Sequence, residues 1–158
     1  MVIKIRINDL GFFFILICIG IFVASNVEEP FRKMVRDLYI FSSDYKIMFT
    51  GKGFYFLNGY FIFEFALFAP LFLYMSNKLR GNQRLIYFLI SMVLFFLTTF
   101  LICYYDSNLK VIECTACKDG ILFINKNSIK YNFIFSVSLI ISLIPVTIKK
   151  ISASVAKK

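Results

Sequence analysis

The chain of 158 residues contains no histidine. Since histidine is the commonest metal ligand and the commonest general base in proteins, its absence argues against most enzyme classes. The chain also shows no glycine-rich phosphate-binding loop, no serine nucleophile elbow and no internal repeat. Zinc is not expected, because only one pair of cysteines stands close together in the sequence. The sequence therefore predicts a protein that is not an enzyme, with no catalytic residues, no metal and no cofactor.

Acidic residues are also scarce, with nine Asp and Glu against 18 Lys and Arg. The chain is 59% hydrophobic and 19% aromatic, with a mean hydropathy of +0.78, which is typical of membrane proteins. In a soluble protein a net charge of +9 would suggest nucleic acid, but here the basic residues lie between apolar runs. That distribution favours contact with the lipid bilayer, where basic residues anchor to anionic headgroups and set topology, and no nucleic-acid partner is expected.

Four apolar stretches are long enough, or nearly long enough, to cross a hydrocarbon core of roughly 30 Å. The short basic link 76–84 makes the second and third stretches antiparallel neighbours. The sequence predicts one integral membrane domain over residues 1–158, an all-α protein whose four transmembrane helices form an antiparallel bundle. The expected helices cover about residues 10–26, 54–75, 85–105 and 133–148, and the third offers Ser91, Thr98 and Thr99 for hydrogen bonds between helices. A cleaved signal peptide is the alternative for the first stretch, but Asp9 interrupts its basic region.

The 18 basic residues divide equally between the two sides of the membrane in this arrangement. They lie more densely on the side of the termini, because the segments there are shorter than the two outer loops, 27–53 and 106–132. The positive-inside rule therefore predicts that both termini are cytoplasmic.

Each outer loop carries a hint of local structure. In the loop 27–53, Pro30 can open an amphipathic helix that lies on the bilayer surface, and a solvated loop is the alternative. In the loop 106–132, a short hairpin is suggested, with its turn near Lys118-Asp119-Gly120. The apolar residues at helical spacing after Pro30 are Phe31, Met34, Val35, Leu38 and Tyr39.

Glu64 lies at the midpoint of the second apolar stretch. A carboxylate at bilayer depth costs about 2.5 kcal/mol or more on insertion scales, so Glu64 should face the protein interior, water or a partner, or else be protonated. It is either a partner contact, a proton site or a substrate contact, or a carboxyl hydrogen-bonded within the bundle, to Tyr60 or to a threonine of the third helix. Asn58 is a weaker candidate, since amides often join helices. Pro70 predicts a bend near the end of this helix.

Cys114 and Cys117 form a C-x-x-C pair in the second outer loop, where they are a possible disulfide or two simple thiols. With Cys103 nearby, the pair resembles that of quinone-coupled thiol oxidoreductases of the periplasmic disulfide-forming and vitamin K epoxide reductase kinds, which also have four helices. Those enzymes use two cooperating cysteine pairs, whereas this chain has one pair and two odd thiols, Cys18 and Cys103.

The chain as a whole resembles the four-helix inner-membrane immunity proteins that protect bacteria against A-type pore-forming colicins. It is similar to them in size, in its four spans and in its two sizeable outer loops. The local similarities are Phe41-Ser42-Ser43-Asp44-Tyr45 with Met48, Ala69-Pro70, Cys103 before a polar turn, and Pro145-Val146-Thr147.

The resemblance implies a binding function in the bacterial inner membrane. An immunity protein of this family recognises the hydrophobic helical hairpin of the colicin pore-forming domain within the bilayer and prevents the channel from opening. Under this hypothesis Glu64 or Asn58 contacts the toxin hairpin, since small and polar groups give specificity between helices in lipid. A toxin gene beside this one on a plasmid would favour it.

Three other functions stay open at this point. The chain resembles an accessory or structural subunit of a larger membrane protein complex, because it is small and has no catalytic set. A transporter or channel component is suggested by Glu64 alone, and a thiol oxidoreductase by the cysteines. Self-association into a homo-oligomer is compatible with each of these functions.

Overall fold

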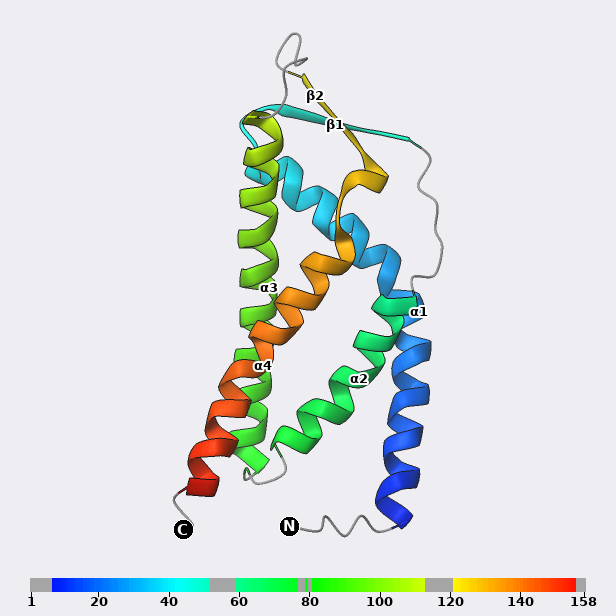
Figure 1. Cartoon of the computed structure of the whole chain (residues 1–158), viewed down its shortest axis with the longest axis vertical. Helices are drawn as coiled ribbons and strands as arrows, with labels where there is room; N and C mark the ends of the chain where they lie inside the picture. The colour runs from blue at the N-terminus through cyan, green and yellow to red at the C-terminus, as the bar shows by residue number, and fades with distance from the viewer. Residues whose placement is uncertain (1–6, 52–58, 77–78, 80, 113–120, 156–158) are drawn as a thin grey trace.

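The protein is mostly helical in a computed structural model that describes residues 7–51, 59–76, 79, 81–112 and 121–155. Its helices run alternately up and down, so that the start of α1, the end of α2, the start of α3 and the end of α4 lie at one end (Figure 1). Two short strands lie at the other end. The elements are α1 (Ile7–Ser42), β1 (Lys46–Thr50), α2 (Gly59–Ser76), α3 (Gly81–Ile112), β2 (Ile121–Asn125), the 3-10 turn η1 (Lys126–Ser128) and α4 (Tyr131–Val155).

Three of the helical segments, residues 11–42, 81–110 and 126–152, are long and apolar enough to cross a membrane. The described part of the second apolar stretch is the shorter helix Phe61–Ser76. The chain therefore has the character of a helical membrane protein. A fourth span and the cytoplasmic position of the termini stay predictions.

The first helix is much longer than the sequence suggested. The prediction that it ends near Asn26, with an outer loop over residues 27–53, is wrong, since α1 continues to Ser42. Pro30 lies inside the helix and removes one backbone donor, yet the Arg32 side chain bridges its turn by donating to the Glu28 carboxylate at 2.6 and 3.0 Å. Figure 1 shows the consequence as a change of direction midway along α1, after which the helix leans across toward α3.

The second half of α1 is an amphipathic helix, which confirms the helical part of one alternative, while the position on the bilayer surface stays a prediction. Buried residues recur every three or four positions along one face, while Glu29, Lys33 and Asp37 are exposed on the other. The apolar face packs inside the protein, so the solvated-loop alternative is wrong. The buried residues are Ala24, Glu28, Phe31, Val35 and Tyr39.

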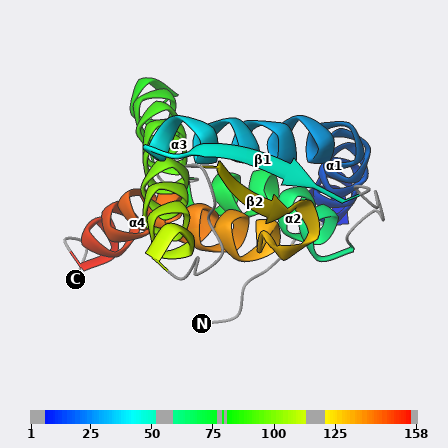
Figure 2. The ribbon, with the colours of Figure 1, turned by 90° about the horizontal axis from the view of Figure 1, so that it is seen from above.

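The two strands come from different predicted loops and pair in parallel, with Lys46 opposite Ile121 and Thr50 opposite Asn125 (Figure 2). In the described residues β2 has β1 as its neighbour. The other strand of the hairpin suggested within 106–132 would lie outside the described residues, so that hairpin stays a prediction. The strands meet because both loops arrive at the same end of the bundle, and each turns buried aliphatic side chains inward. The turn proposed at 118–120 lies outside the described residues.

The third and fourth helices also extend beyond the predicted spans. α3 continues past Tyr105 to Ile112, so the prediction that residues 106–132 form an outer loop is wrong for its first seven residues. Within this extension Lys110 lies 3.3 Å from the Asp106 carboxylate one turn earlier, a pair that favours continued helix. α4 covers the predicted range 133–148 and extends beyond it at both ends, whereas residues 54–58 of the second predicted helix lie outside the described part.

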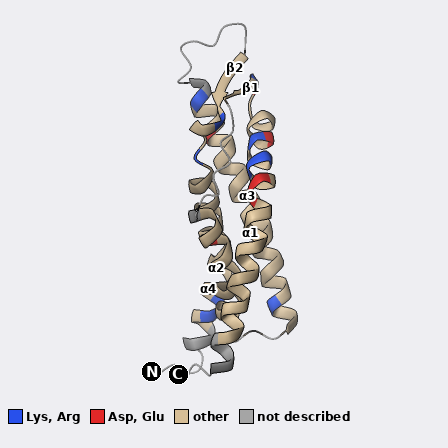
Figure 3. Cartoon of the chain, turned by 90° about the vertical axis from the view of Figure 1, so that its right-hand side faces the viewer, with Lys and Arg blue, Asp and Glu red and all other residues tan. Residues whose placement is uncertain are grey.

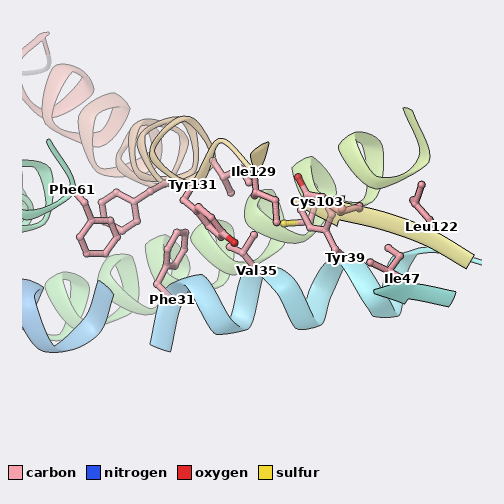
Figure 4. Packing of buried hydrophobic residues seen from close by; sticks show 12 residues of the cluster. Phe31, Val35, Tyr39, Ile47, Phe61, Cys103, Leu122, Ile129 and Tyr131 are labelled. Carbon is pink, nitrogen blue, oxygen red and sulfur yellow. The ribbon is translucent and has the colours of Figure 1, made fainter. Parts of the chain in front are cut away.

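The hydrophobic core lies in the half of the molecule nearer the strands. Phe135 of α4 is its centre, with ring centroids 4.4 Å from Phe61, 5.2 Å from Phe31 and 5.6 Å from Phe95. Side chains from α1, α3 and both strands continue the cluster toward the sheet (Figure 4). The core therefore fixes the angles at which the four helices meet.

Candidate functional site

An open cavity of about 620 Å³ lies between α1, α2 and α3, in the half of the molecule away from the strands. Its walls are almost wholly apolar, with Arg84 of α3 as the one charged residue that lines it. We call it the three-helix groove. Six of its lining residues are Leu16 and Gly20 of α1, Ala69 and Phe72 of α2, and Arg84 and Phe88 of α3.

The groove exists because α1 and α2 come into close contact at Gly20 and then separate toward the end that carries the termini. A Cβ atom on Gly20 would lie 2.7 Å from the Ala66 Cα atom, so only glycine permits this crossing. Figure 1 shows that α2 then leans away from α1 toward the end that carries the termini. The divergence leaves α3 to form the third wall.

The side chains of α1 in this half have few protein neighbours. Between Gly11 and Val23 the only buried residue is Gly20. Large apolar side chains exposed together on one segment mark a contact with lipid or with a protein partner. The large exposed side chains there are Phe12, Phe14, Ile15, Ile19, Ile21, Phe22 and Val23.

Glu64 is half-buried on α2 and accepts a hydrogen bond from Ser136 of α4, whose Oγ lies 2.8 Å from both carboxylate oxygens. The expectation of a hydrogen bond inside the bundle is confirmed, with Ser136 as the partner among the described side chains, whereas the bond to Tyr60 stays a prediction. The hydroxyl groups of Thr98 and Thr99 instead donate to backbone carbonyls one turn earlier in α3. The Thr99 hydroxyl also lies within hydrogen-bond distance of Ser138 Oγ, at 3.0 Å. One hydroxyl proton leaves most of the acceptor capacity of a carboxylate unused, so Glu64 can still accept from a partner.

The position of the other predicted site residues is not part of the described structure. Asn58, Cys114 and Cys117 lie outside the described residues, as does the side chain of Tyr60. Cys18 is a free, exposed thiol on α1, and Cys103 is a free thiol buried in the core beside Tyr39.

A polar cluster that sequence reasoning missed joins α1 to α3 near the strands. The Tyr39 hydroxyl donates to the Asp106 carboxylate, and Lys110 holds that carboxylate from the next turn, with its ammonium 5.4 Å from the Tyr39 ring centre. The hydroxyl oxygens of Ser42 and Ser107 lie 3.1 Å apart alongside. Figure 3 shows charged residues gathered on the half of α1 nearer the strands. The signal in the sequence was the spacing of Asp106 and Lys110, which suits two turns of one helix rather than a loop.

The chain was compared with protein-family models, with curated proteins and with solved structures, and none of them matches it.

Proposed function

We propose that the protein is an immunity protein of the bacterial inner membrane, which binds the pore-forming domain of a cognate bacteriocin and prevents its channel from opening. The observation that carries the proposal is the three-helix groove. It is an open, apolar surface beside α1 and α3, two helices long and apolar enough to cross a membrane, where a hydrophobic toxin hairpin within the bilayer would bind.

The groove suits a helix better than a polar ligand. Apolar side chains line it, and the small, exposed residue Ala69 lets a second backbone approach closely. Lipid tails are as apolar as leucine, so recognition between helices in a membrane needs close packing and polar contacts rather than burial alone. We propose that the groove supplies the close packing.

Glu64 does not line the groove, and in this proposal it supplies a separate polar contact on the side of α2 that meets α4. Its carboxylate already joins α2 to α4 through Ser136, which fixes its position before the partner arrives. The remaining acceptor positions can take a donor of the toxin hairpin. A cognate toxin would donate a hydrogen bond to the carboxylate, and this bond would strengthen its binding. A non-cognate toxin with an apolar residue at that position would leave the carboxylate without a partner, which gives discrimination between toxins.

The topology predicted from the sequence places the termini in the cytoplasm and the strands on the outer side, where a pore-forming toxin arrives. The strands and the polar cluster of Tyr39 and Asp106 then form a folded cap outside the bilayer. The cap holds α1 against α3 and so keeps the lower half of α1 positioned beside the groove.

The test is a protection assay. The chain is expressed in a sensitive strain, the cells are challenged with a panel of pore-forming and nuclease colicins, and survival and potassium efflux are followed. We expect protection against one pore-former. Ala69→Trp fills the groove, and we expect it to raise sensitivity by about tenfold or more, equivalent to about 1.4 kcal/mol of lost binding. Val93→Trp is the matched control, because Val93 is exposed on α3 and does not line the groove.

Glu64→Gln tests the polar contact separately, since it keeps the shape of the side chain and removes the charge. Full protection by this variant would remove Glu64 from the recognition site while leaving the groove in place. If no toxin in a broad panel were blocked although the chain was inserted in the membrane, the immunity proposal would be wrong. Co-purification of other membrane subunits in mild detergent would then identify an accessory subunit.

A further inference from the structure

A second cavity, of about 300 Å³, lies deeper in the bundle, where all four helices meet. We call it the inner cavity. Its wall is dominated by aromatic rings, and Ser91 of α3 contributes the one hydroxyl group that lines it. The rings belong to Phe31 of α1, Phe65 and Phe68 of α2, Phe95 and Phe96 of α3, and Phe135 of α4.

Ser91 is unusual among the buried hydroxyl residues of the described chain. It is 1% exposed, and its Oγ has no hydrogen-bond partner among the described residues. Ser142 is equally buried at 1% but donates to the Leu139 carbonyl at 2.7 Å, and Thr99 donates to Ser138. A buried hydroxyl without a partner is costly, so each such group in a folded protein calls for an explanation.

The chemistry of the wall indicates what would satisfy this hydroxyl. Phenylalanine rings pack best against another planar ring, in stacked or edge-to-face contact. A neutral ring carrying a carbonyl oxygen would fill the aromatic space and accept the Ser91 proton, whereas an acyl chain would leave the hydroxyl unpaired. A water molecule is disfavoured, because it needs two or more polar partners and the wall offers one side chain.

A ligand of this kind can reach the cavity from the bilayer. The inner cavity shares Phe65, Phe68 and Met92 with the three-helix groove, so the two spaces adjoin. Lipid-soluble quinones combine a planar ring, carbonyl acceptors and solubility in hydrocarbon. We propose that the inner cavity binds the ring of a membrane quinone, with the Ser91 hydroxyl donating a hydrogen bond to a ring carbonyl.

The proposal concerns binding only and does not depend on toxin recognition. The bound ring would fill the space between the four helices and complete the aromatic cluster around Phe135. Occupancy would therefore stabilise the bundle, because a ligand that binds only the folded state raises its stability.

The test uses the full chain in nanodiscs of synthetic, quinone-free lipid. A decyl-substituted benzoquinone is titrated while the melting temperature and the bound quinone are measured. We expect saturable binding of about one quinone per chain together with a rise in melting temperature. Ser91→Ala should weaken binding about tenfold, Ser91→Thr should keep it because the hydroxyl remains, and Ser142→Ala is the matched control at equal burial.

A second readout needs no ligand. Ser91→Ala removes an unpaired buried hydroxyl, so the empty variant should melt at the same temperature as the parent chain or higher, whereas Ser142→Ala should not gain stability. The proposal would be overturned by absence of saturable binding, by equal affinity of the Ser91→Ala variant, or by decanol competing as well as the quinone. The last outcome would show that an acyl chain occupies the cavity.

Discussion

The half of the molecule nearer the strands and the half nearer the termini are built differently from the same four helices. Near the strands, Phe135 contacts four other rings and the Tyr39–Asp106 bond joins α1 to α3. Near the termini, α1 meets α2 through Gly20 and otherwise leaves its apolar side chains exposed beside an open groove. The half nearer the strands therefore stabilises the fold, and the half nearer the termini leaves an apolar surface open for binding.

The difference also has a physical cause. Close packing of aromatic rings and a buried polar contact hold helices together in either surroundings. Where lipid surrounds the helices, it can cover apolar side chains as well as protein can, so loose packing there costs little. A groove among membrane helices is therefore tolerated where the same groove in a soluble core would collapse or destabilise the protein.

The largest effect is expected from the aromatic core. Phe135→Ala removes a ring that is 3% exposed, and we expect a loss of about 3–5 kcal/mol in the free energy of unfolding from lost packing and a cavity. Phe133→Ala is the matched control on the same helix, because Phe133 is 59% exposed. Unfolding in mild detergent titrated with a denaturing detergent measures both. Equal losses in the two variants would mean that the core is not where the structure places it.

A smaller effect is expected from the polar cluster. Tyr39→Phe keeps the buried ring but removes the hydroxyl that donates to the Asp106 carboxylate, and hydrogen bonds to charged groups contribute about 1.5–3 kcal/mol. Lys110 still contacts the carboxylate, so we expect the lower part of that range. Tyr105→Phe is the control, since Tyr105 is exposed on the same α3. Unchanged stability in the Tyr39 variant would show that the cap does not hold α1 to α3.

The membrane-spanning character of the fold could be predicted from the sequence, because apolar length is a strong signal. The helix ends could not. The segments 28–37 and 106–110 contain charged residues. Charged residues after an apolar run were interpreted as the start of a loop. The structure instead uses those charges in pairs one turn apart, Glu28 with Arg32 and Asp106 with Lys110, which stabilise helices that continue past the predicted spans.

The candidate site was predictable only in part. Glu64 stood out because a carboxylate in an apolar run is rare, and its hydrogen bond within the bundle follows from the cost of leaving it unpaired. The partner Ser136 and the parallel pairing of β1 with β2 depend on which helices are neighbours, and one sequence does not contain that information. Gly20 and Ser91 are small residues in apolar stretches of the sequence. Only the arrangement of the helices shows that Gly20 permits a close contact and that Ser91 lines a cavity.

The smallest effect is expected in the half near the termini. Gly20→Leu places a Cβ atom 2.7 Å from the Ala66 backbone, so α1 must move away from α2. Overpacking of this kind costs about 1–3 kcal/mol, and we expect about 1–2 because the helix borders an open groove into which it can shift. Gly11→Leu on the same helix is the matched control, since no atom lies within 4 Å of its added Cβ. The same detergent titration measures the loss, and pairwise distances between spin labels on α1 and α2 measure the shift. A loss as large as that of Phe135→Ala would mean that the half near the termini is as tightly packed as the half near the strands, and the division between a holding half and a binding half would then be wrong.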